Sequence, residues 1–115
     1  MLPYKNRIID KKDFLAVHRF GRFFSLGVLS LKIQKNRLKI TRIGLSVGLK
    51  FSKKAVERNR VKRQLRAIVS QNMNQIKGGF DIIIMVKKGK RKTISTSVLI
   101  NDWEKFLKER NLIIK

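Results

Sequence analysis

The hydrophobic positions nearest the N-terminus predict a short amphipathic helix. Phe14, Val17 and His18 fall at i, i+3 and i+4, so they share one helical face. Asp10 can cap the start of this helix, and Gly21 can end it. We therefore expect one helix between the capping aspartate and the glycine.

Alternating apolar and polar positions then predict strands. Residues 25–34 alternate in their second half, residues 42–49 alternate throughout, and residues 38–40 can form a further short strand. One face of the 42–49 segment carries almost no side chains, since its positions are Gly44, Ser46 and Gly48. A face this bare predicts that either a helix or a ligand approaches its backbone closely.

The longest predicted helix covers residues 53–77, which contain no glycine or proline. Its apolar residues recur at helical spacing: Val61, Leu65, Ile68, Val69, Met73 and Ile76. Residues 80–86 form a continuous apolar run, typical of a central strand that is buried on both faces. Thr93 or Ser95 starts a last helix, whose apolar stripe is Leu99, Trp103, Phe106 and Leu107.

The predicted order is helix, strands, long helix, strand, helix. A strand–helix–strand sequence implies at least one parallel pair in a mixed sheet. We therefore predict an α+β fold in which a single sheet packs on helices. The 115 residues fit one domain, 1–115, in which residues 1–8 form a flexible basic N-terminus.

The charge of the chain excludes several classes of protein. Lysine and arginine number 29 against 7 aspartate and glutamate, a net charge of +22, yet 43% of residues are hydrophobic. A disordered basic tail would be poorer in apolar residues, and an ordinary small-molecule enzyme would not be this basic. A folded body of such charge repels itself unless a polyanion neutralises it. Nucleic acid is the predicted partner, and an acidic membrane surface is the weaker alternative.

Several classes of site are missing from the sequence. Cysteine is absent, so no disulfide or thiolate zinc site can form, and no apolar run is long enough to span a membrane. The start of the chain does not resemble a secretory signal, and we expect a cytoplasmic protein. The single histidine and the seven scattered carboxylates predict no catalytic residue and no metal ligand from the protein itself.

Residues 50–66 form the densest basic segment, with eight basic residues against Glu57. Arg58, Lys62 and Arg66 repeat at i, i+4, without carboxylates to neutralise them. The start of the helix adds Lys53 and Lys54, where the helix dipole disfavours cations and a phosphate would relieve the conflict. The pattern favours a nucleic-acid contact over an ordinary solvated face.

The segment Arg58-Asn59-Arg60-Val-Lys62-Arg63, followed by Arg66, resembles the Arg-Asn-Arg motif of the bacterial ribonuclease P protein subunit. Three other segments also resemble that family: Arg42-Ile-Gly-Leu-Ser-Val47, Asp13-Phe14 with Val17 and Gly21, and Phe80-Asp-Ile-Ile-Ile. The resemblance covers about residues 7–110, nearly the whole chain.

This resemblance implies both a fold and a function. The fold would be a four-stranded sheet with three helices and a left-handed strand–helix–strand crossover, although the general rule predicts the opposite hand. The protein would pair with a catalytic RNA and help to remove the 5′ leader of precursor tRNA, leaving a 5′-phosphate. RNA-bound Mg²⁺ would perform the chemistry. No membrane and no small-molecule substrate would be involved.

The resemblance also assigns residues to two surfaces. Contacts to the catalytic RNA would come from Arg58, Asn59, Arg60, Lys62, Arg63 and Arg66, together with Lys53 and Lys54 at the start of the helix. The leader would lie in a cleft formed by Phe14, His18, Lys32 and Ser46, with Arg58, Asn59 and Lys62 beside it. Without the resemblance, Phe14 and His18 could equally be packing residues, and the Lys87–Lys92 loop is as compatible with a plain surface as with an RNA contact.

Two other functions share this composition. A structural RNA-binding protein of the ribosomal type would have a similar charge, but would not prefer tRNA that carries a leader. A DNA-binding protein would place the long helix in the major groove, yet no short helix precedes it at helix-turn-helix spacing. A membrane-surface role is the weakest, because the basic helix has no exposed aromatic face.

Overall fold

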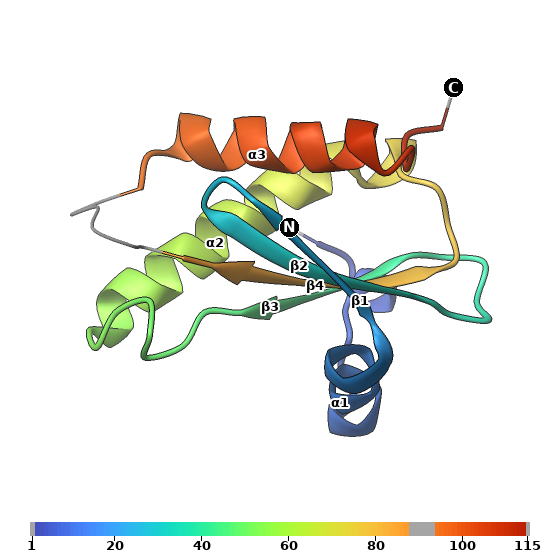
Figure 1. Ribbon diagram of the computed structural model, residues 1–115, viewed down its shortest axis with the longest axis horizontal. Coiled ribbons are helices and arrows are strands. Elements are labelled where there is room, and N and C mark those ends of the chain that lie inside the picture. Colours follow the sequence, from blue (N-terminus) through green and yellow to red (C-terminus); the bar gives the residue numbers. More distant parts are fainter. Residues whose placement is uncertain (1, 88–93, 115) are drawn as a thin grey trace.

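The computed structural model describes residues 2–87 and 94–114 (Figure 1). It confirms the α+β prediction, with one mixed sheet and three α-helices. Along the chain the elements are η1 (Tyr4–Asn6), α1 (Lys11–Phe20), β1 (Arg22–Leu26), β2 (Leu29–Lys35), β3 (Arg42–Ser46), α2 (Ala55–Asn72), η2 (Met73–Gln75), β4 (Phe80–Val86) and α3 (Thr96–Glu109).

The sheet has the strand order β1-β2-β4-β3. β1 pairs antiparallel with β2, and β2 pairs antiparallel with β4, whereas β3 and β4 are parallel neighbours joined through α2. This confirms the predicted parallel pair. β4 is also central and buried on both faces, because Ile82, Ile83 and Ile84 are fully buried. The left-handed sense of the crossover stays an expectation from the family resemblance.

The molecule has three layers, with α2 and α3 on one face of the sheet and α1 on the other (Figure 1). The main core lies between the sheet and the α2–α3 layer. There the rings of Trp103 and Phe106 stack with centroids 5.7 Å apart, and Leu65 and Val69 of α2 are fully buried. On the second face of the sheet, α1 covers part of the area (Figure 1), and a hollow lies beside the covered part.

The strand predicted from the alternating second half of residues 25–34 is confirmed as β2, but the structure adds a strand before it, β1, which forms a hairpin with β2. β1 and β2 are joined by Gly27 and Val28, and Gly27 has a positive φ of 59°. The Val28 amide donates a hydrogen bond to Oδ2 of Asp102 at 2.8 Å, which fixes the turn against α3. β1 was missed because its sequence, Arg-Phe-Phe-Ser-Leu, does not alternate clearly between apolar and polar residues.

Local hydrogen bonds explain why residues 38–40 do not form the further strand that the pattern allowed. The Asn36 side chain accepts from the Leu38 amide at 2.8 Å and donates to the Ile40 carbonyl at 3.2 Å. These bonds fold the chain into bends, since an asparagine side chain competes with a strand ladder. The next strand and the long helix are both shorter than predicted, with β3 ending at Ser46 and α2 ending at Asn72.

The predicted helix caps are present. The Asp10 side chain accepts from the Lys12 amide, and Gly21 follows the last residue of α1. Ser95 rather than Thr93 caps α3, where its hydroxyl accepts from the Val98 amide. Within residues 1–8, the segment expected to be a flexible N-terminus, Leu2 is only 3% exposed and the Ile8 amide donates to the Ile43 carbonyl at 3.0 Å, whereas Tyr4 is 72% exposed.

Candidate nucleic-acid interface

Two neighbouring rows of side chains cross the α1-side face of the sheet, as the strand register shows. One row is Phe23, Lys32, Ile83 and Gly44, and the next is Ser25, Ser30, Met85 and Ser46. α1 contacts the first row through Phe14, which packs on Gly44. The second row lies beyond α1 and lines a hollow in the surface. The face is therefore half covered and half accessible.

The Phe14 ring of α1 packs directly on Gly44. A Cβ atom built on this glycine would lie 2.8 Å from Cε2 of Phe14. Of the two alternatives for the bare strand face, a helix therefore fills this position. Phe14 stays half-buried and lines a hollow of about 250 Å³ that also contains Lys62 and Arg66 of α2. The structure thus brings together an aromatic ring and two cations that the sequence assigned to RNA contacts.

A charged bridge holds α1 against the sheet beside this hollow. Arg42 of β3 pairs with Asp13 of α1 at 3.1 Å and with Asp81 of β4 at 2.6 Å. The hydrogen bond to Asp81 raises the pKa of the Arg42 guanidinium despite the opposing effect of burial. Asn36 donates a further hydrogen bond to Asp81 at 2.8 Å. The buried carboxylate is therefore well satisfied, and it fixes where α1 sits.

His18 and Lys32 meet at the C-terminal end of α1. Lys32 Nζ donates a hydrogen bond to the His18 carbonyl at 2.7 Å, where the helix dipole favours a cation. The rings of Phe14 and His18 lie 5.1 Å apart. Burial and, secondarily, the charge of Lys32 lower the pKa of His18 below 6.5, so its ring is neutral at neutral pH. Neither residue lines the hollow beside Phe14 or the hollow that contains Ser46.

The second hollow, of about 520 Å³, contains Ser46. Its walls include three residues that the sequence analysis did not assign to the cleft: Phe23, Lys50 and Lys87. Phe23 is 57% exposed, and Lys87 donates a hydrogen bond to the Ser25 hydroxyl. Recognising β1 as a strand would have placed Phe23 on this face. The remainder of the predicted basic loop, residues 88–92, lies outside the described part of the chain.

The basic residues of α2 divide between its two flanks. At 100° per residue, Arg58, Lys62 and Arg66 form one row on the flank that faces β3, with Asn59 and Arg63 exposed beside it. Arg60 lies on the other flank, which faces α3, where Gln64 donates to the Thr96 hydroxyl at 2.9 Å. Arg58 also donates to the Ser52 carbonyl at 2.8 Å, so it braces the loop before the helix.

The start of α2 already contains a carboxylate. Glu57, in the first turn, accepts a hydrogen bond from the Ser52 hydroxyl at 2.6 Å. The Ser52 hydroxyl in turn accepts from the Lys54 amide at 3.1 Å. Lys53 and Lys54 are both exposed beside this capping network. The side chains of these lysines are therefore accessible, while Glu57 complements the helix dipole.

No metal site is apparent in the described residues. Within 2–87 and 94–114, no three His, Cys, Asp or Glu side chains gather where they could hold an ion. Asp13 and Asp81 lie near one another but are engaged by Arg42. No helix in the same ranges has the length and apolar character needed to cross a membrane.

Comparisons with known proteins identify the family and the fold of the chain. The sequence model of the family Ribonuclease P matches residues 2–111. The ribonuclease P protein component of Pseudanabaena sp. is 46% identical over 87 residues, which cover 75% of each chain. The RNase P protein from Thermotoga maritima is similar in structure, with a TM-score of 0.79 and 28% identity over 89% of this chain and 97% of that one. For the Staphylococcus aureus RNase P protein the TM-score is 0.81, with 25% identity over 95% and 98%.

Proposed function

Because the chain belongs to the ribonuclease P protein family, and so serves as the protein subunit of a tRNA-processing endoribonuclease, we propose a separate role for each of its two surfaces. The basic row of α2 binds the catalytic RNA. The α1-side face of the sheet binds the 5′ leader of precursor tRNA. The observation that supports this proposal is the hollow in which Phe14 of α1 meets Lys62 and Arg66 of α2, because it places the two surfaces next to one another.

The α2 surface suits a folded RNA. Arg58, Lys62 and Arg66 place three cations along one flank, and Asn59 and Arg63 extend it outward. Each phosphate that such a surface neutralises releases counterions, which makes binding favourable and dependent on salt. Lys53 and Lys54 continue the basic surface beyond the start of the helix. Arg60, on the opposite flank, would contact a different segment of the RNA.

The α1-side face suits a single strand of variable sequence. Phe14 offers an aromatic ring beside Lys62, and the second hollow offers Phe23 beside Lys50 and Lys87. Aromatic rings stack on any base, and lysines follow the backbone phosphates, so this pairing tolerates many sequences. In this arrangement His18 and Lys32 fix the end of α1 and contribute less to direct contact.

The chemical step belongs to the RNA in this proposal. The described residues offer no cluster of carboxylates for a metal ion, and the best-placed pair is engaged by Arg42. Mg²⁺ would therefore be held by RNA oxygens. The protein would lower the Mg²⁺ requirement by neutralising phosphates where RNA segments crowd together.

Cleavage of precursor tRNA at limiting Mg²⁺ tests this function. A bacterial ribonuclease P RNA from a matched source is assayed with and without the protein. The protein should restore accurate 5′ cleavage, and the gain should shrink when the leader is cut to a few nucleotides. The protein could instead bind the RNA without restoring cleavage, although that RNA is active alone at high Mg²⁺. This result would favour a structural RNA-binding protein.

A further inference from the structure

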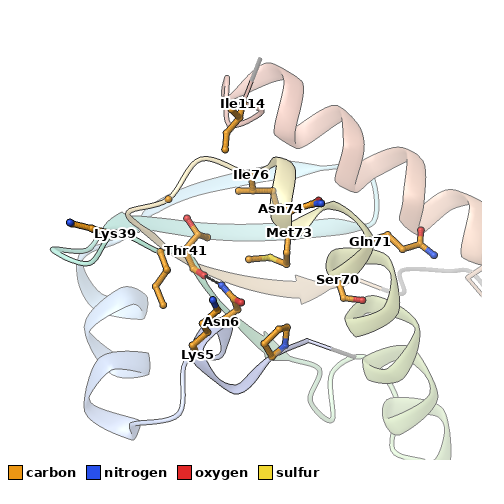
Figure 2. Close-up of a pocket in the computed structure, with 13 residues that line it drawn as sticks. Lys5, Asn6, Lys39, Thr41, Ser70, Gln71, Met73, Asn74, Ile76 and Ile114 are labelled. Carbon is orange, nitrogen blue, oxygen red and sulfur yellow. Dashed lines mark hydrogen bonds between the residues drawn. The ribbon is translucent and has the colours of Figure 1, made fainter.

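A further hollow lies beyond the C-terminal end of the basic row of α2. It has a volume of about 620 Å³ and is enclosed by η1, the loop between β2 and β3, and the C-terminal end of α2 (Figure 2). The pocket lies at the C-terminal end of α2, where Ser70 follows Arg66, the last residue of the basic row, by one helical turn. The proposed RNA and leader contacts leave this α2-end pocket without a role.

Hydrogen bonds between separate segments fix the walls of the α2-end pocket. Asn6 Nδ2 of η1 donates to the Thr41 carbonyl at 2.9 Å, and Thr41 Oγ1 donates to the Lys77 carbonyl at 2.6 Å. Gly78 packs so closely that a Cβ there would lie 2.0 Å from the Lys39 carbonyl oxygen. Three separate segments are thereby tied together. A pocket held in this way needs little ordering when a ligand enters.

The lining of this pocket is apolar in the middle and polar at its edges. Figure 2 shows Met73 and Ile76 between the helix end that carries Gln71 and the segments that carry Lys5 and Lys39. Ile76 is buried, whereas Gln71 and the two lysines are exposed. Asn74 adds a second exposed amide. Among the described residues that line the pocket there is no carboxylate to neutralise the lysines.

We infer that the α2-end pocket binds one unpaired nucleotide of the RNA partner. The base lies against Met73 and Ile76, and its polar edge meets the amides of Gln71 and Asn74. Amide side chains pair well with base edges, and unstacked bases are the usual targets of sequence-specific RNA recognition. This inference rests on the proposed RNA-binding function.

Charge favours a nucleotide over a neutral peptide as the occupant. In this proposal the phosphates on either side of the inserted base pass near Lys5 and Lys39, which line the pocket. The net charge of the whole chain is +22. Two exposed lysines without a carboxylate partner therefore bind a polyanion more favourably than a neutral ligand. An RNA held here and at the basic row would contact both ends of α2.

Photocrosslinking tests the position directly, because the chain has no cysteine of its own. Gln71→Cys and Asn74→Cys carry a photoreactive label in the complete ribonucleoprotein, with Glu104→Cys on α3 as the matched exposed control. Both pocket probes should crosslink to the same unpaired RNA segment, and the control should not. The inference is overturned if neither pocket probe crosslinks to RNA in a complex that cleaves precursor normally. It is also overturned if both probes crosslink to protein alone.

Affinity for the RNA provides the second readout. The double variant Gln71→Ala/Asn74→Ala should weaken RNA binding about tenfold, without changing its salt dependence, because two hydrogen bonds and no charge are lost. Lys5→Ala should reduce the salt slope by about 0.7. The control is Gln75→Ala, an exposed amide that does not line the pocket.

The outcomes separate the two proposals. If wild-type protein binds the RNA and stimulates cleavage while the double variant binds equally well, the nucleotide pocket is wrong and the proposed function stands. If wild-type protein binds no ribonuclease P RNA, both proposals are wrong. Circular dichroism of the variants should match the wild type, because Gln71 and Asn74 are exposed.

Discussion

The ring of Phe14 lies on the backbone of Gly44, so close that a Cβ on the glycine would lie 2.8 Å from the ring. This contact determines how closely α1 packs on the sheet. The Phe14 ring also lines the hollow that contains Lys62 and Arg66. The glycine is therefore as much a part of the proposed leader surface as the aromatic residue above it.

Gly44→Ala should displace Phe14. Crowding of this kind costs about 1–3 kcal/mol, because the ring must move or the strand must shift. We expect a lower free energy of unfolding in urea and weaker binding of leader-bearing precursor tRNA by the holoenzyme. For the free energy of unfolding, Gly48→Ala is the matched control, since a Cβ there meets nothing within 4 Å; it is not a control for leader binding, because Gly48 lines the second hollow. Equal effects of the two substitutions would show that the Phe14 contact does not position α1.

Arg42→Met should destabilise the fold by about 3–5 kcal/mol, because it leaves the buried carboxylate of Asp81 without its cation. Asp13→Asn should cost only about 0–1 kcal/mol, since the Asp13 side chain is 42% exposed and its ion pair is screened by water. Urea unfolding of the two variants measures the contrast. A small effect of Arg42→Met would mean that Asp81 finds another partner.

Arg66→Ala should reduce the dependence of RNA binding on salt. If Arg66 neutralises one phosphate, the slope of log affinity against log salt becomes shallower by about 0.7–0.9. Binding to ribonuclease P RNA across a salt series measures this slope. Lys105→Ala, an exposed lysine on α3, should leave the slope unchanged. An unchanged slope for Arg66→Ala would remove this residue from the RNA interface.

His18 should make stability fall at mildly acidic pH. Its pKa is lower in the folded protein than the ordinary value of 6.5, so the unfolded chain binds more protons between those two values. Stability is therefore lost as the pH falls from 6.5 through the folded pKa, and the loss is complete below it. His18→Gln should remove this component from a urea-unfolding series at several pH values. An identical pH profile for the variant would contradict the shifted pKa.

Much of the fold follows from residue patterns. The apolar run at residues 80–86 predicted a doubly buried strand, and Ile82 to Ile84 are fully buried in β4. The periodicity of α2 and α3 predicted their buried stripes, since Leu65, Val69 and Trp103 all face the core. These signals are strong because each element buries a regular set of side chains.

The hairpin and the second hollow could not be predicted in the same way. β1 lies at the edge of the sheet and buries few side chains, so its pattern is weak. Missing it meant missing Phe23 as a wall of the hollow. The Asn36 bonds that replace a strand with bends are local side-chain bonds, and the Lys32 bond to the end of α1 joins two separate elements. Hydrogen bonds of this kind produce no periodic pattern of apolar residues in the sequence.

The measurement closest to the central claim is the affinity of the holoenzyme for leader-bearing precursor tRNA relative to mature tRNA. The reconstituted complex is titrated with tRNAs whose leaders grow one nucleotide at a time, at fixed salt and Mg²⁺. We predict that the affinity ratio rises with the first several leader nucleotides and then levels off, and that Gly44→Ala reduces the rise. Equal affinities for precursor and mature tRNA, in a complex whose cleavage the protein still stimulates, would contradict a leader site on the α1-side face.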